Sequence, residues 1–149
     1  MRALKHKVLA YVTRGNHLLV FSHPHFPDAG IQVPAGTLRD GETPEAGVIR
    51  EAIEETGLTG LALVAFLGEY RRDMSDFGLD EIHHRHIYHL RCDGDPPERW
   101  NHFERDPSGG DSEPILFEFF WATMPNEIPE LAAGHGDMLP ALFRSVSRM

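Results

Sequence analysis

The segment 43–57, TPEAGVIREAIEETG, is the stretch that most constrains the fold, because both of its ends favour a helix. Thr43 can cap the free backbone amides at the start of a helix, and Pro44 suits the first helical position, where no donor is needed. Gly57 can adopt the positive φ that commonly ends a helix. The segment therefore predicts a helix over residues 44–56.

Three glutamates, Glu51, Glu54 and Glu55, fall within an arc of about 100° on this helix. Like charges four residues apart cost ~0.2 to 0.5 kcal/mol, and Gly47, on the same arc, costs about 1 kcal/mol relative to alanine. Arg50 can pair with Glu54, but no base on the helix offsets the other two carboxylates. A solvated acidic face is the ordinary interpretation. These energetic penalties are explained if the face binds a cation, with Gly47 leaving room for it. Clustered carboxylates suit Mg²⁺ or Mn²⁺.

The charge of the chain narrows the classes of function. A net charge of -9 disfavours binding to a DNA or RNA backbone, because like charges repel. A small anionic substrate is compatible with this charge if cations bridge it to the acidic groups. The 149 residues correspond to a single domain, 1–149, with a substantial core.

The single cysteine, Cys92, can form no intramolecular disulfide, which suits a reducing cytoplasm. The sequence shows neither a secretory signal nor an apolar run of the ~18 to 20 residues that a membrane-spanning helix needs. We therefore expect a cytoplasmic protein that does not associate with membranes.

Apolar patterning and turn residues divide the rest of the chain into short elements. Loops are expected at 23–30, 35–42, 74–81 and 92–112, the last with a short structured piece near Trp100. A second helix is expected near 136–147. Strands are expected at 4–14, 17–22, 31–34, 61–73, 82–91 and 114–124. This order of strands, helix, strands and helix predicts an α+β fold with a mixed sheet.

The stretch 36–58, GTLRDGETPEAGVIREAIEETGL, resembles the Nudix box, G-x5-E-x7-R-E-U-x-E-E-x-G-U, where U is a bulky apolar residue. Every fixed letter matches at its spacing, from Gly36 and Glu42 through to Gly57. Ala52, which is smaller than the usual residue at a U position, is the one departure. The resemblance implies a Nudix hydrolase fold, an α/β/α sandwich around a mixed β-sheet. It also implies hydrolysis of a nucleoside diphosphate linked to another moiety, assisted by Mg²⁺ or Mn²⁺.

The resemblance implies roles for individual residues. Glu51, Glu54 and Glu55 would bind the metal together with the backbone carbonyl of Ala35. Arg50 would orient the glutamates through ion pairs, so that Glu51, Arg50 and Glu54 form the predicted catalytic set. Glu42 corresponds to the early glutamate of the box, which is often structural. Gly36 and Gly57 would provide the backbone geometry of the turns.

The general base could lie either within the Nudix box or outside it. Glu51 is the choice within the box, and many Nudix proteins instead take the base from outside it. Glu118 interrupts the apolar strand LFEFF and is also predicted to contact substrate, although it could equally point to solvent at a sheet edge. The candidates outside the box are Glu104, Asp111, Glu113 and Glu118.

Basic residues on the predicted sheet could bind a substrate phosphate. Arg71, Arg72 and Arg85 flank the sheet, and an arginine can hold phosphate through two parallel hydrogen bonds. We choose Arg71 and Arg85 as substrate-binding candidates, while a surface charge is the ordinary alternative for each. The aromatic residues that could stack on a base are Phe26, Tyr70, Trp100 and Phe103, although core packing is the usual role of such residues.

Four histidines lie on the strand predicted at 82–91. Alternation places His84 and His86 on one face, with His83 and His89 on the other. A pair two residues apart can bind zinc, but no cysteine partner is near and the main site suits hard ions. A solvated or substrate-contacting strand is therefore favoured. We expect substrate choice to lie in the loops 23–30 and 92–112.

Two classes of function compete. The first is a divalent-metal-dependent pyrophosphohydrolase, acting on a nucleoside triphosphate, a dinucleoside polyphosphate, a nucleotide sugar such as ADP-ribose, or an isoprenoid or inositol diphosphate. The second is a non-catalytic nucleotide-binding or sensor module with the same fold, and the intact glutamates favour the first. A homodimer is a further expectation by analogy, in which the aromatic strand 115–121 could supply the interface.

Overall fold

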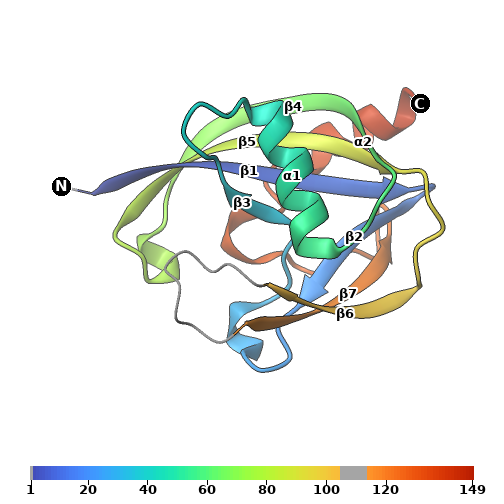
Figure 1. Ribbon diagram of the computed structural model, residues 1–149, viewed down its shortest axis with the longest axis horizontal. Coiled ribbons are helices and arrows are strands. Elements are labelled where there is room, and N and C mark those ends of the chain that lie inside the picture. The colour runs from blue at the N-terminus through green and yellow to red at the C-terminus, as the bar shows by residue number, and fades with distance from the viewer. Residues whose placement is uncertain (1, 105–113) are drawn as a thin grey trace.

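The computed structural model describes residues 2–104 and 114–149 as seven strands, two α-helices and three short 3-10 helices (Figure 1). The helices are α1 (Pro44–Thr56) and α2 (Leu139–Ser147). The 3-10 helices are η1 (Pro27–Ala29), η2 (Ser75–Phe77) and η3 (Ala132–Gly134). The strands are β1 (Ala3–Arg14), β2 (His17–Ser22), β3 (Ala35–Thr37), β4 (Leu61–Asp73), β5 (Glu81–Cys92), β6 (Arg99–Glu104) and β7 (Ile115–Thr123).

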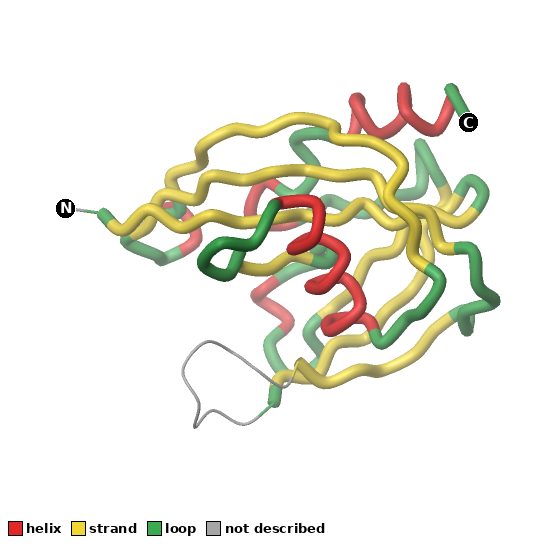
Figure 2. Tube along the Cα trace, turned by 45° about the horizontal axis from the view of Figure 1, so that its top comes forward, coloured by secondary structure: helices red, strands yellow, loops and turns green. Residues whose placement is uncertain are grey.

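All seven strands belong to one mixed sheet with the order β4-β5-β1-β2-β7-β6, and β3 pairs separately with β1. β1 runs parallel to β5 from Ala3 to Thr13. Its other edge is divided between two antiparallel partners, because Lys7–Leu9 pairs with β3 and Thr13–Arg14 pairs with β2. In Figure 2, the sheet bends so that α1 lies between the β4–β5–β1 strands and the β6–β7 arm.

The two α-helices cover opposite faces of the sheet, which confirms the predicted α+β sandwich. Val48 and Ala52 of α1 pack in one apolar cluster with Val8 and Tyr88 of the central strands. Leu142 of α2 is fully buried in a second cluster on the other face. Burial of these apolar side chains is the main force that holds each helix against the sheet.

Helix α1 begins and ends where the sequence predicts. The Thr43 hydroxyl accepts a hydrogen bond from the Ala46 amide at 3.2 Å. Gly57 adopts φ 76° and donates its N–H to the Ile53 carbonyl. Pro44 fills the first turn, where a missing amide costs no helical hydrogen bond.

Two strands lie in segments that were expected to be loops. β3 starts at Ala35, immediately after the stretch 31–34, which forms only isolated bridges. Pro34 ends that stretch because proline has no amide to donate to a ladder. β6 occupies Arg99–Glu104 inside the expected loop 92–112, and it pairs along its whole length with β7.

The expected start of the second helix at 136 is also wrong. α2 begins at Leu139 because Pro140 is accommodated only in its first turn. The aromatic strand β7 is hydrogen-bonded to β2 on one edge and β6 on the other, so any contribution to an interface would come from its side chains. Among the described helices, none has the length and apolar character to cross a bilayer.

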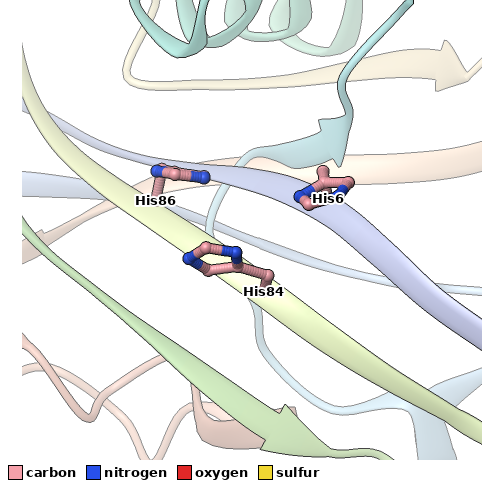
Figure 3. A group of neighbouring side chains, drawn as sticks. All are labelled: His6, His84 and His86. Atoms are coloured by element: carbon pink, nitrogen blue, oxygen red, sulfur yellow. The ribbon is translucent and has the colours of Figure 1, made fainter.

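The histidines of β5 alternate between the two faces of the sheet, as expected. His83 and His89 are buried on one side, where His89 contacts the hydroxyls of Thr13 and Ser145 at 2.7 Å each. His84 and His86 lie on the other side, next to His6 of β1 (Figure 3).

Candidate active site

A cavity of about 880 Å³ lies where α1 passes over β3 and meets β1, β5 and β6. It gathers all three predicted metal-binding glutamates of α1. Basic side chains from β1 and β5 share the same space. The residues that carry the argument below are Lys7, Glu51, Glu54, Glu55, Arg85 and Glu104.

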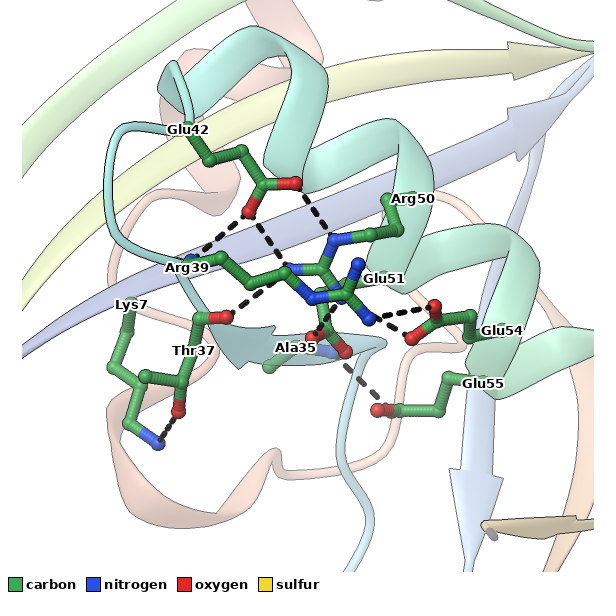
Figure 4. Close-up of polar contacts among 9 residues, drawn as sticks. All are labelled: Lys7, Ala35, Thr37, Arg39, Glu42, Arg50, Glu51, Glu54 and Glu55. Carbon is green, nitrogen blue, oxygen red and sulfur yellow. Dashed lines mark hydrogen bonds and ion pairs between the residues drawn. The ribbon is translucent and has the colours of Figure 1, made fainter. Parts of the chain in front are cut away.

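Arg50 joins the acidic face of α1 to the loop before it (Figure 4). Its Nε donates to Glu42 Oε2 at 2.7 Å and its Nη2 to Glu42 Oε1 at 2.8 Å, forming a bidentate pair. Its Nη1 donates to Glu51 Oε1 at 2.7 Å and to Glu54 Oε2 at 3.1 Å. Hydrogen bonding to Arg50 lowers the pKa of Glu42 to about 2. One guanidinium therefore holds three carboxylates in place.

These contacts correct the charge balance inferred from the sequence. Arg50 pairs with Glu51 as well as with Glu54, although one-residue spacing gives no helical neighbour relation. Arg39 from the preceding loop adds a contact of 3.4 Å to Glu54. Within the described residues, no ion pair reaches Glu55. Among the three candidate metal-binding glutamates, Glu55 is therefore the one without an ion pair to a described residue.

Glu55 is buried, with 6% of its surface exposed. Its Oε1 accepts a hydrogen bond from the Ala35 amide at 3.2 Å. Burial, followed by the nearby charge of Glu104, raises the pKa of Glu55 well above its ordinary value. A carboxyl in this environment gains from an adjacent cation. The donor set, made of carboxylate and carbonyl oxygens, fits a hard divalent ion.

Two glycines set how closely the box packs. A Cβ on Gly36 would lie 2.1 Å from the carboxyl carbon of Glu51, so the absence of a side chain lets this glutamate pass over β3. A Cβ on Gly47 would lie 2.3 Å from Leu38 and 3.0 Å from Glu42. Gly47 therefore makes room for the loop, and the expectation that it leaves space for a cation is wrong.

The opposite part of the cavity wall is basic. Lys7 donates to the Thr37 hydroxyl at 2.6 Å, and burial lowers the pKa of its ammonium group. Arg85 is only 2% exposed and donates to the Tyr70 hydroxyl at 3.3 Å. Its buried Nε has no hydrogen-bond partner among the described residues. Such a donor is costly to leave unpaired.

The other predicted site residues divide between the cavity and the rest of the surface. Glu104 lines the cavity at the end of β6. Arg71 is exposed on β4, and Glu118 pairs with Arg99 at 3.1 Å; neither is among the described residues that line the cavity. Asp111 and Glu113 lie outside the described residues.

The predicted aromatic contacts divide in the same way. Phe103 is 47% exposed and lines the cavity. Trp100 instead stacks on Phe119 in the core and donates its indole N–H to the Thr56 carbonyl at 2.9 Å. Met74, Phe77 and Leu79 also line the cavity and were missed, although three apolar residues in the otherwise polar stretch 74–81 could have drawn attention to them.

Several solved structures share this fold. A UDP-X diphosphatase superposes with a TM-score of 0.65 at 12% identity, covering 99% of this chain and 65% of that one. An ADP-ribose pyrophosphatase from Streptococcus suis gives 0.62 at 18%, covering 97% and 92%. A bifunctional NMN adenylyltransferase/ADP ribose pyrophosphatase from Francisella tularensis, complexed with AMP and a Mn ion, gives 0.60 at 19%, covering 98% and 43%. This chain spans less than two thirds of the first and third proteins.

At these identities the superpositions show a common fold. The family model described as NUDIX domain matches residues 4–142, which is nearly the whole chain and includes the box at 36–58. The resemblance found in the sequence is thus confirmed, and the chain belongs to the Nudix hydrolase family.

Proposed function

We propose that this protein hydrolyses a pyrophosphate bond in a nucleoside diphosphate-linked substrate, and that it requires Mg²⁺ or Mn²⁺. The observation that carries the proposal is the position of Glu55, a buried carboxylate without an ion-pair partner among the described residues, in the same cavity as Lys7 and Arg85. An acidic group that needs a cation and basic groups that need an anion meet in one space. A metal diphosphate supplies both.

Glu51, Glu54, Glu55 and the Ala35 carbonyl would hold the metal. When bound, the cation offsets negative charge on the phosphoryl oxygens and lowers the pKa of a coordinated water. Arg50 touches no substrate in this proposal. It is a positioning residue that fixes Glu51 and Glu54 through its hydrogen bonds.

Arg85 and Lys7 would bind the non-reacting phosphate oxygens. The unpaired Nε of Arg85 offers a hydrogen bond that a phosphate oxygen can accept. Lys7 presents a compact positive charge on the neighbouring strand β1. Both residues would bind the ground state and the transition state, so their loss affects KM more than kcat.

Glu51 is our choice for the general base, because burial raises its pKa and thereby its basicity. Glu104 is the alternative outside the box, since it lines the same cavity near Glu55. The pH profile of kcat distinguishes them, because substitution of the true base by glutamine removes the acidic limb. Substitution of the other residue leaves that limb in place.

The test is a panel of nucleoside triphosphates, dinucleoside polyphosphates and nucleotide sugars, assayed with Mg²⁺ and with Mn²⁺. Product masses after reaction in isotopically labelled water show which phosphorus is attacked. We expect turnover of at least one class that disappears with a chelator. Tight binding of a nucleotide that is recovered intact would instead favour the sensor module. The cytoplasmic location and the homodimer stay predictions.

A further inference from the structure

Three histidines from two adjacent strands gather on the face of the sheet that α1 covers, outside the cavity (Figure 3). The parallel register of β1 and β5 places His6 opposite His84. His86 lies two residues further along β5, on the same face. His83 and Arg85, which line the cavity, point to the opposite face. The two groups of side chains are therefore separated by the sheet itself.

The imidazoles are close enough to share a ligand. One ring nitrogen from each of the three lies within 4.8 Å of those of the others. The rings of His84 and His86 stack with centroids 4.6 Å apart, and the rings of His6 and His84 are 5.6 Å apart.

A carboxylate from a third strand lies beside two of these histidines. Glu69 of β4 pairs with His86 in the antiparallel register. Its Oε2 lies 3.1 Å from His86 Nδ1 and 3.6 Å from His84 Nε2. Three imidazoles and one carboxylate are a donor set that suits Zn²⁺ and other borderline metals, in contrast to the oxygen donors of the cavity.

We propose that His6, His84, His86 and Glu69 form a second metal site, which binds Zn²⁺ or a chemically similar transition-metal ion. Zinc–nitrogen bonds of about 2.0 to 2.1 Å bring tetrahedral ligands to roughly 3.4 Å from one another, so the rings must rotate inward. His6 is exposed, which gives the ion a path of entry and gives the ring freedom to turn. His84 and His86 are half-buried and supply the fixed side of the site.

The bound ion would tie β1, β4 and β5 together at one end of the sheet. This end also supports the loop that leads into α1, because the His6 carbonyl accepts a hydrogen bond from the Leu38 amide at 2.9 Å. The second ion therefore acts on stability and on the rigidity of that loop. Its chemistry is separate from hydrolysis, and the proposal does not depend on the proposed function.

Calorimetric titration of zinc chloride into the untagged full-length chain tests the site, in a buffer with excess Mg²⁺ to occupy hard oxygen ligands. We expect one zinc ion per chain. His84→Gln should raise the Kd at least tenfold, whereas the matched control His25→Gln, an exposed histidine in the 23–30 loop, should leave it unchanged. Equal Kd values for the two variants, or no zinc bound by the wild type, would overturn the proposal.

Two further measurements separate this site from the carboxylates of α1. Glu55→Gln should keep zinc binding, and loss of binding in that variant would assign the ion to the cavity and overturn the proposal. With zinc about 100-fold above Kd, the Tm of the wild type should rise by roughly 5 to 10 °C. His84→Gln should show no such rise, and an equal rise in His84→Gln would contradict the site.

Discussion

The acidic and basic parts of the cavity wall are organised in opposite ways. The carboxylates of Glu42, Glu51 and Glu54 are held by Arg50 before any ligand binds. Arg85, in contrast, is buried, and none of the residues that the structure describes pairs with its Nε. The acidic part is a preassembled network whose members satisfy one another, with Glu55 as its exception. In the proposed function, the basic part is completed only when an anion binds, so the two parts should respond differently to substitution.

The largest effect should come from Glu55→Gln. The change keeps the shape and the hydrogen bond from the Ala35 amide, but it removes the charge that a cation needs. We expect kcat to fall by about 100- to 1,000-fold, the range for loss of one charge-stabilising group. Circular dichroism should show an unchanged fold. Wild-type turnover in this variant would remove the metal assignment and the distinction drawn for Glu55.

Arg50→Lys tests whether the acidic network is preassembled. Lysine keeps the charge but lacks the planar group that forms the bidentate pair with Glu42. We expect a loss of roughly 1.5 to 3 kcal/mol in the free energy of unfolding, measured by urea titration without metal. Arg39→Lys is the control, because its single exposed contact with Glu54 should be worth about 0 to 1 kcal/mol. Equal losses would show that Arg50 is no more important than a surface charge.

Arg85→Met and Arg71→Met compare a buried with an exposed arginine. Methionine fills similar space without donors, so Arg85→Met should raise KM about tenfold, corresponding to one lost hydrogen bond with a charged partner. Arg71→Met should leave both kcat and KM near wild-type values. Steady-state kinetics on the best substrate of the panel measure both KM values. Equal KM values for Arg85→Met and Arg71→Met would show that Arg85 does not bind the phosphate.

A pH-dependent effect on stability is expected at His135, which lines the cavity near Arg85. Burial first, and then the charge of Arg85, lowers the pKa of His135 to about 3. The unfolded chain binds this proton near pH 6.5 and the folded chain does not. Stability is therefore full above pH 6.5 and is lost as pH falls toward 3, by at most about 1.4 kcal/mol per pH unit.

Urea titrations of the wild type and of His135→Asn between pH 7 and pH 4 measure how much stability His135 loses on acidification. The variant should show a shallower loss of stability on acidification. His25→Gln is the control and should follow the wild-type slope, because His25 is exposed. Parallel curves for the wild type and His135→Asn would mean that the basic part of the wall tolerates a further positive charge.

The acidic part could be predicted from sequence because its geometry is local. The capping residue, the closing glycine and the spacing of Glu51, Glu54 and Glu55 all lie within one helix. The role of Arg50 was expected from the family resemblance. Its contact with Glu51 depends on side-chain conformation, which the helical positions alone do not determine.

The basic part could be predicted only incompletely because it is assembled by strand pairing. Lys7 and Arg85 lie 78 positions apart in sequence and become neighbours through the parallel register of β1 and β5. The same register brings His6 to His84, a partner that the sequence of β5 alone could not reveal. β6 was expected only as a short structured piece near Trp100, because its short sequence becomes a strand by pairing with β7.

The divided edge of β1 has a consequence for how such a protein can change. The segment between β2 and β3 leaves and rejoins the same strand, so both of its ends are anchored on β1. Insertions between β2 and β3 would lengthen a loop whose two ends stay fixed on β1, without shifting α1. Gln32, within this segment, borders the cavity. In the proposed function, evolution could therefore change this part of the cavity wall while the carboxylates of α1 keep their positions.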